Sequence, residues 1–251
     1  MILKLQRKTP NNACRAELGQ FPLIVNMQKR SLKFWMHLKS SPTESLHFKA
    51  LQAQELNPEK SLLSQLVLRL TNPTNPTNTN QSQTSTASHT HIRINQITKQ
   101  SKSTYLEHWD QETKSQSKLQ FYRNLKSNYE LEEYLQSVRD TKQRRILSRY
   151  RLSEHSLAIE TGRHRKSWLP REQRVCVHCR TGEIETETHF LLHCHKYSSV
   201  RELYFSKLTN LIQNFTAMTE VDQLKILLGE GQTAALAARY VCVCHSLRDS
   251  R

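Results

Sequence analysis

The residues best suited to chemistry lie within positions 175–197, where three of the six cysteines and four of the twelve histidines fall close together. Cys176 and Cys179 have the Cys-x2-Cys spacing that allows a tight turn to direct two thiolates toward one ion. His189 and Cys194 follow and complete a set of four sulfur and nitrogen ligands. Because a catalytic zinc ion keeps one position open, this closed set predicts a structural Zn²⁺ site.

Spacing alone leaves the fourth ligand open. His193 lies one helical turn after His189, so its imidazole could face the ion in place of Cys194. We expect His178 and His195 to be exposed, and the competing interpretation is that the clustered cysteines are buried free thiols. The other cysteines lack a second set of four ligands and are expected to be small core residues: Cys14, Cys242 and Cys244.

The positive charge of the chain gathers just before this cluster. The net charge is +15, of which residues 139–174 carry +7, whereas residues 175–251 are neutral. Clustered cations bind polyanions by releasing phosphate counterions, so we expect nucleic acid, RNA or single-stranded DNA, rather than a merely solvated basic surface. Tyr150 and Trp168 could stack on bases, although ordinary packing is the simpler expectation for both. The residues expected to contact phosphates are Arg144, Arg145, Arg149, Arg151, Arg163, Arg165 and Lys166.

Composition predicts a mainly α-helical chain. Only five glycines are present, too few for a tightly turned sheet protein, and a hydrophobic content of 36% indicates that part of the chain is unpacked. We expect two small helical units, residues 1–70 and 104–251, the second containing a zinc knuckle at 175–197. A disordered linker at 71–103, almost entirely Thr, Asn, Gln and Ser, is expected to join them.

Apolar residues at helical spacing predict the individual helices. In the first unit we expect a helix over residues 22–39, a second capped by Ser41 with Glu44, and a third after Asn57. A further capping box at Thr104 is expected to begin the helices of the second unit. The positions expected to be buried are Ile24, Met27, Phe34, Trp35, Leu38, Leu62, Leu63, Leu66, Val67, Leu70, Leu131, Tyr134, Leu135, Val138, Ile146, Leu147 and Tyr150.

Secreted, membrane and enzymatic proteins are not expected from this sequence. No signal peptide is visible, nor any run of the roughly 18 apolar residues needed to cross a bilayer, so we expect an intracellular protein, nuclear or cytoplasmic, without membrane contact. A reducing compartment favours metal over disulfides for the clustered cysteines. No Ser-His-Asp arrangement is convincing, and the acids near the histidines, Glu183, Glu185 and Glu187, are expected on an exposed strand or loop.

Four stretches, in the same order, resemble the C-terminal region of the reverse-transcriptase polyprotein of LINE-type non-LTR retrotransposons, especially those abundant in fish. They are ACRAELGQFPL, LSRYRLSEHSLAIETGR, CVHC with ETETHFLLHCHKYSSVR, and LLGE with AARYVCVCHSLR. Together they cover most of the chain apart from the polar linker. The resemblance implies a region downstream of the polymerase whose Cys-Cys-His-Cys group binds zinc and is associated with nucleic-acid contact.

The resemblance also selects among the ligands. It assigns Cys176, Cys179, His189 and Cys194 and leaves His193 as a neighbour. The chain departs from the family because it has no Asp-Asp dipeptide, which the polymerase needs to hold two metal ions, and no endonuclease region. We therefore expect a non-catalytic, zinc-stabilised nucleic-acid-binding fragment. The alternatives are a zinc-stabilised helical protein-interaction module and a transposon relic without a selected function.

Overall fold

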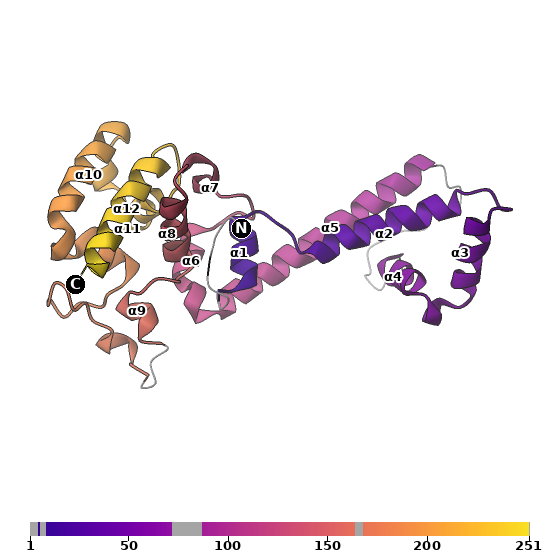
Figure 1. The fold of residues 1–251 in the computed structure, drawn as a ribbon, viewed down its shortest axis with the longest axis horizontal. Helices are drawn as coiled ribbons and strands as arrows, with labels where there is room; N and C mark the ends of the chain where they lie inside the picture. The colour runs from indigo at the N-terminus through magenta and orange to yellow at the C-terminus, as the bar shows by residue number, and fades with distance from the viewer. Residues whose placement is uncertain (1–4, 6–8, 72–86, 164–167, 251) are drawn as a thin grey trace. The chain divides into compact units, whose positions relative to one another are not determined.

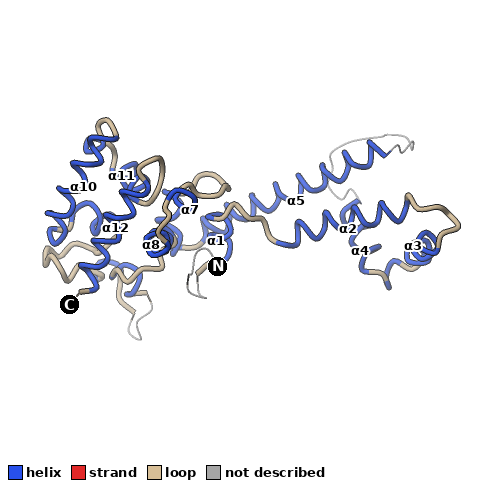
Figure 2. The backbone as a smooth tube through the Cα atoms, turned by 45° about the horizontal axis from the view of Figure 1, so that its top comes forward, coloured by secondary structure: helices blue, strands red, loops and turns tan. Residues whose placement is uncertain are grey.

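The structure, a computed structural model, describes the whole chain except residues 1–4, 6–8, 72–86, 164–167 and 251. The described residues are mainly α-helical, and Figure 2 shows helices and loops but no strand among them. In these ranges β structure is limited to two isolated bridges, and one of them, between Val175 and Ile184, belongs to the cysteine-rich segment. The predicted mainly α fold is confirmed.

The chain divides into two compact units at positions that differ from the expected ones. The smaller unit is Phe21–His108, and the larger unit combines Met1–Gln20 with Trp109–Arg251. The N-terminal segment belongs to the larger unit because α1 (Asn11–Glu17) ends in a buried glutamate that bonds Arg151. A periodicity-based reading of the sequence misses this assignment, since the partner lies 134 positions away.

Helix α5 (Ala87–Ser115) overlaps the second half of the expected linker. It begins inside the polar tract, so residues 87–103 are helical, and residues 72–86 lie outside the described part of the chain. Ile94 is buried in the small core of its unit, and such tertiary packing stabilises a helix whose own sequence is polar. Thr104 lies inside α5 and therefore caps no helix.

The smaller unit is a set of helices around a limited core. Helix α3 is capped by Ser45, whose hydroxyl accepts a hydrogen bond from the amide of Phe48 at 3.2 Å. Ser41, the expected cap, instead donates to the carbonyl of His37. The helices of this unit are α2 (Leu23–Lys39), α3 (Leu46–Leu56), η1 (Pro58–Lys60), α4 (Leu62–Thr71) and most of α5.

The apolar face expected in this unit is wrong in part. Leu38 is buried as predicted, but Ile24, Met27 and Phe34 of α2 are each more than half exposed. Leu62 of α4 is also exposed. The core of the unit is small and covers only a narrow side of each helix, so apolar residues beside that side remain in contact with solvent.

The larger unit holds the main hydrophobic core. Its rings include Tyr150 and Phe190, which stack with centroids 5.3 Å apart, whereas Leu131, expected in this core, is 43% exposed. Its remaining helices are η2 (Ser117–Leu119), α6 (Gln120–Leu125), α7 (Tyr134–Ser137), α8 (Thr141–Arg151), α9 (Ala158–Thr161), η3 (Arg171–Gln173), η4 (His189–His193), η5 (His195–Tyr197), α10 (Ser198–Leu211), η6 (Phe215–Ala217), α11 (Glu220–Leu227) and α12 (Ala234–Asp249). Helix α12 packs against α8, α10 and α11 (Figure 1).

A buried ionic network joins α1 to α8 within the larger unit. Arg151 is 1% exposed and donates from Nε and Nη2 to the two carboxylate oxygens of Glu17, at 2.8 and 3.0 Å. Its Nη2 also lies 2.6 Å from a carboxylate oxygen of Glu132, and Tyr134 donates its hydroxyl to Glu17 at 2.7 Å. Arg151 cannot reach a phosphate from this position. The expectation that it would is therefore wrong.

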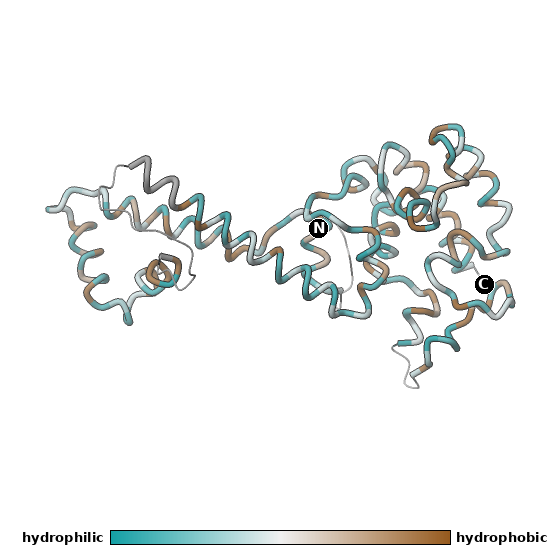
Figure 3. The backbone as a smooth tube through the Cα atoms, turned by 180° about the vertical axis from the view of Figure 1, so that it is seen from behind, coloured by the Kyte–Doolittle hydropathy of each residue, from teal (hydrophilic) through white to brown (hydrophobic). Residues whose placement is uncertain are grey.

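No helix in the described ranges combines the length and the apolar character that a bilayer crossing requires. Helix α5 spans 29 residues, but charged residues such as Lys99, Lys102 and Glu107 interrupt its apolar positions. Figure 3 shows hydrophilic and hydrophobic positions interspersed along the helices rather than gathered into one long run.

Candidate metal centre

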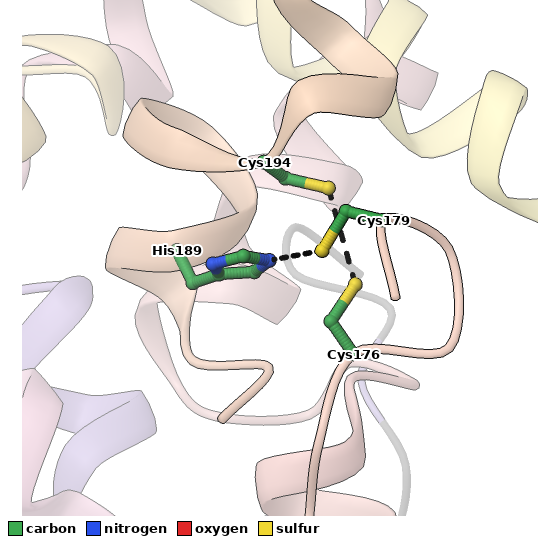
Figure 4. A group of neighbouring side chains, drawn as sticks. All are labelled: Cys176, Cys179, His189 and Cys194. Atoms are coloured by element: carbon green, nitrogen blue, oxygen red, sulfur yellow. Dashed lines mark hydrogen bonds between the residues drawn. The ribbon is translucent and has the colours of Figure 1, made fainter. Parts of the chain in front are cut away.

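The four predicted ligands converge on one point in the larger unit (Figure 4). One ligand atom from each of Cys176, Cys179, His189 and Cys194 lies within 4.8 Å of all the others. The sulfurs of Cys176 and Cys194 are 3.9 Å apart, and the sulfur of Cys179 is 3.4 Å from Nε2 of His189. Zn–S bonds of about 2.3 Å at tetrahedral angles separate two sulfurs by about 3.8 Å, so these distances fit a tetrahedral ion.

A short hairpin positions the first two cysteines. The bridge between Val175 and Ile184 holds its arms together, and the amide of Cys176 donates to the carbonyl of Glu183 at 2.8 Å. Gly182 has a positive φ of 79° in the turn, a conformation that glycine adopts without steric cost. The hairpin therefore presents both thiols on one side, as the Cys-x2-Cys spacing predicts.

A π-helical turn, η4, positions the other two ligands. The amide of Cys194 donates to the carbonyl of His189, five residues earlier, at 2.7 Å. Such an i to i+5 bond widens the turn and brings residues five apart onto one side. Consequently the thiol of Cys194 faces the same point as His189. His193, which an α-helix would place there, instead bonds Glu220 at 2.8 Å and is exposed.

Glu183 orients the histidine ligand. Its carboxylate lies 2.6 Å from Nδ1 of His189, so Nδ1 carries the proton that it donates and Nε2 keeps its lone pair for a metal. Partners of this kind fix the tautomer and the ring orientation of metal-binding histidines. No local pattern separates Glu183 from the two neighbouring glutamates, because only the fold brings it to the ring.

The three thiols differ in how readily they ionise. Burial raises the pKa of Cys194 to about 12 and also raises the pKa of Cys176. Burial acts in the same direction on Cys179, but hydrogen bonds outweigh it, those from Thr181 above all, and lower the pKa of Cys179 to about 6. Cys179 is thus the thiol most ready to meet a cation as a thiolate, and a bound cation displaces the protons of the other two.

The glutamates of the hairpin are not an exposed row of acids. Glu185 is buried and accepts two hydrogen bonds from Arg248 of α12, at 2.9 and 3.0 Å. Glu187 is also buried, 2.9 Å from Nε2 of His155. The expectation of an exposed strand or loop is correct for Glu183 alone. The two buried acids attach the segment between the ligands to the rest of the larger unit.

The remaining cysteines and histidines lie elsewhere. Cys244 is buried in the core and Cys242 is half-buried beside it, consistent with small core residues, and Cys14 also packs against this core. His195 is exposed as expected, whereas His178 is half-buried, with Nδ1 lying 3.3 Å from the ammonium group of Lys196.

Several expected phosphate contacts are already engaged within the protein. Arg145 is exposed on α8. Arg144 is half-buried and donates to the carbonyl of Leu135 at 3.4 Å, and Arg149 is half-buried and donates to the carbonyl of Glu154 at 3.1 Å. Both arginines therefore add positive charge near the surface, but each guanidinium is partly fixed by its hydrogen bond to a backbone carbonyl.

Of the two arginines and one lysine predicted to contact phosphate after α9, the structure describes only the first arginine. Arg163 donates to the hydroxyl of Ser117 at 2.9 Å and lies 3.1 Å from a carboxylate oxygen of Glu160. Arg165 and Lys166 lie outside the described part of the chain. Of the five expected contacts that the structure describes, Arg151 lies inside the protein and the other four are exposed or half-buried.

The two candidate stacking residues have different environments. Tyr150 is 1% exposed and its ring stacks between His155, at 4.9 Å, and Phe190, at 5.3 Å. Packing is therefore the role of Tyr150. Trp168 is 66% exposed, so its ring is open to a ligand.

The comparisons with known proteins give no match: no family model, curated protein or solved structure is similar to this chain. The evidence for a metal-binding group therefore comes from the geometry of the chain itself. Three thiols and one imidazole, all close enough to share one ion, form a group in the larger unit that could bind a metal.

Proposed function

We propose that the larger unit is a non-catalytic, zinc-stabilised nucleic-acid-binding module, related to the tail of the LINE-type reverse-transcriptase polyprotein. The convergence of Cys176, Cys179, His189 and Cys194 carries the proposal. These are the four positions at which the resembling stretches place the family's zinc ligands. Sulfur and nitrogen donors at these distances suit zinc better than they suit magnesium or calcium, which prefer oxygen.

The bound ion has a structural role in this proposal. Three thiolates and a neutral imidazole bring a zinc complex to about −1, so the centre itself does not attract phosphate. Zinc contributes roughly 10–16 kcal/mol to the folding of zinc-finger peptides, and here it joins the hairpin to the π-turn. The donor set fills a tetrahedral shell and leaves no position for substrate, which supports a non-catalytic role.

Exposed cations around α8 supply the proposed contact with phosphate. Lys142 and Arg145 lie three positions apart on α8, hence on one side of the helix, and Arg139 precedes its cap. All three are exposed, and we name them the basic face (Arg139, Lys142 and Arg145). Contacts of this type bind the backbone of RNA or single-stranded DNA without reading its sequence.

Zinc binding is tested with two matched histidine variants. We expect the purified chain to hold one zinc ion, and His189→Gln to lose it while His193→Gln retains it, because only His189 faces the other ligands. Metal content is measured by mass spectrometry after gel filtration. Equal zinc in the two variants, or none in the wild-type chain, would refute the assignment.

Nucleic-acid binding is tested by the anisotropy of labelled RNA and single-stranded DNA. We expect the affinity to fall steeply with added salt, since each neutralised phosphate contributes about 0.7 to the log–log slope for single strands. Replacing the basic face by glutamine should weaken binding and leave zinc in place, whereas Cys179→Ser should abolish both. Binding that ignores salt would contradict the proposal.

A protein-interaction module is the second candidate, favoured by exposed apolar residues of the smaller unit. Leu23, Met27 and Phe34 of α2 are each more than half exposed and share one side of the helix at spacings of four and seven. A partner retained after nuclease treatment and lost in Phe34→Ser would favour this candidate over nucleic-acid binding.

A further inference from the structure

A small polar pocket lies in the larger unit, and none of the four candidate metal ligands lines it. It has a volume of about 180 Å³ and lies between the start of α6, helix α9 and the segment that follows the hairpin. A water molecule occupies about 30 Å³ of liquid, and pockets for drug-sized ligands measure roughly 300–1,000 Å³. The pocket is therefore suited to one small ring rather than to a large ligand.

Two buried oxygen atoms in the pocket lining have no protein partner among the described residues. Ser153 is 2% exposed and Glu160 is 5% exposed, and neither Oγ of Ser153 nor Oε2 of Glu160 makes a hydrogen bond to the protein. The other carboxylate oxygen of Glu160 lies 3.1 Å from Nε of Arg163. A buried carboxylate oxygen without a donor is costly, and because this atom has almost no accessible surface, an N–H group of a ligand reaches it only after the pocket lining shifts.

Other lining residues supply the complementary chemistry. Phe121 is half-buried and lines the pocket, so an aromatic side chain forms part of its wall. Lys118 and Arg171 also line the pocket, and no described residue bonds their charged groups. A ligand that satisfies all these groups carries an N–H donor, an aromatic ring and an anion.

We propose that this pocket receives one unstacked nucleotide of a single strand and prefers a base that bears an amino group. The amino group would donate to Glu160, the adjacent ring nitrogen would accept from the hydroxyl of Ser153, and Lys118 and Arg171 would meet the neighbouring phosphates. This inference rests on the proposed function, because it names the strand feature that the larger unit recognises. Single-stranded sites commonly read such base edges beside an aromatic ring.

Cytosine and uracil distinguish this pocket from the general basic surface. They have the same ring size, but uracil has a carbonyl oxygen where cytosine has the amino group, and that oxygen would face a carboxylate. A hydrogen bond to a charged group contributes about 1.5–3 kcal/mol. We therefore expect oligocytidylate RNA to bind at least about tenfold more tightly than oligouridylate of equal length.

The experiment uses the full chain loaded with zinc and compares Glu160→Gln with Glu172→Gln. Glu172 is exposed on η3, so its variant has the same change in net charge outside the pocket. We expect the preference for oligocytidylate to disappear in Glu160→Gln and to persist in Glu172→Gln, with zinc content and circular dichroism unchanged in both. Equal affinities for the two strands in the wild-type chain, or equal losses in both variants, would overturn the proposal.

Free nucleotides separate failure of the pocket from failure of the proposed function. Cytidine and uridine 5′-monophosphate are titrated into the chain and followed by NMR, where we expect only the cytidine nucleotide to shift resonances, and Glu160→Gln to abolish the shifts. If no strand binds but cytidine monophosphate still does, the pocket stands and the proposed function fails. If strands bind in a salt-dependent manner without preference and neither nucleotide shifts resonances, the pocket fails alone. If neither strands nor nucleotides bind, both fail.

Discussion

Replacing Arg151 by methionine tests whether this arginine is structural rather than a phosphate contact. Methionine keeps much of the aliphatic volume and removes the charge, so the main loss is the ionic network. The wild-type guanidinium bonds both oxygens of Glu17, lies 2.6 Å from Glu132 and donates to the carbonyl of Leu228 at 3.2 Å. Burial alone lowers the pKa of Arg151, but Glu17 and Glu132 hold it above its ordinary value.

The expected destabilisation of Arg151→Met is about 3–5 kcal/mol, the usual cost of removing one partner from a buried ion pair. Two carboxylates would remain inside the protein. Among the described residues, Glu17 would keep the hydroxyl of Tyr134 as its partner, and Glu132 would keep the ammonium of Lys126 at 2.6 Å. In contrast, Arg149→Met should cost about 1 kcal/mol, because the side chain of Arg149 is half-buried and makes one hydrogen bond, to a carbonyl.

Urea-dependent hydrogen exchange of the α8 amides provides the measurement. It reports the stability of the larger unit without interference from the smaller one, and urea, unlike guanidinium chloride, does not screen charges. The double variant Glu17→Gln with Arg151→Met should be more stable than the sum of the single effects predicts, by about 0.5–3 kcal/mol. A loss below about 1 kcal/mol in Arg151→Met, comparable to that of Arg149→Met, would show that the buried network has little energetic role.

Two further predictions concern the core. Gly229→Ala should destabilise the larger unit by about 2–4 kcal/mol in urea unfolding, because φ is +106° and the added Cβ would lie 2.5 Å from Cβ of Tyr134. Gly231→Ala is the control, because its added Cβ meets nothing within 4 Å, and it should cost only the backbone strain of about 1–2 kcal/mol. Burial lowers the pKa of His245 despite the attraction of Asp249, so the unfolded chain binds the proton more readily and stability is lost as the pH falls through about 6.5. The melting temperature of His245→Gln should therefore decline less between pH 7 and pH 5 than that of the wild-type chain, and parallel declines would contradict this assignment.

The candidate metal ligands were the most predictable part of the site, and the conformation that selects among them was the least. Cys176 and Cys179 could be paired from their spacing, since a Cys-x2-Cys turn is a local structure. The choice between His193 and Cys194 depends on whether the turn after His189 is α-helical or π-helical. Residue spacing contains no signal for a single wide turn, and here only the family resemblance pointed to Cys194.

The basic residues show the opposite limit. The helical pattern correctly predicts that α8 combines apolar and basic positions. The pattern cannot identify which arginine points inward and pairs with an acid. Arg151 and Arg145 are both arginines of α8, yet one is 1% exposed and the other is on the surface. The difference is made by Glu17, which the fold brings from 134 positions away. Long-range partners of this kind also explain why the N-terminal segment belongs to the larger unit.

The candidate metal centre and the basic face are connected by packed side chains. The π-turn that carries His189 also carries Phe190, whose ring stacks on Tyr150 of α8 at 5.3 Å and 1° from parallel. Releasing the turn would remove this support from the helix that presents Arg145. Replacing one of the four metal-binding residues should therefore weaken nucleic-acid binding through α8, although none of these residues is proposed to touch the nucleic acid. In contrast, Arg145→Gln should leave the metal in place. This asymmetry is expected if the metal stabilises the surface that binds the nucleic acid, and not if the metal itself contacts the nucleic acid.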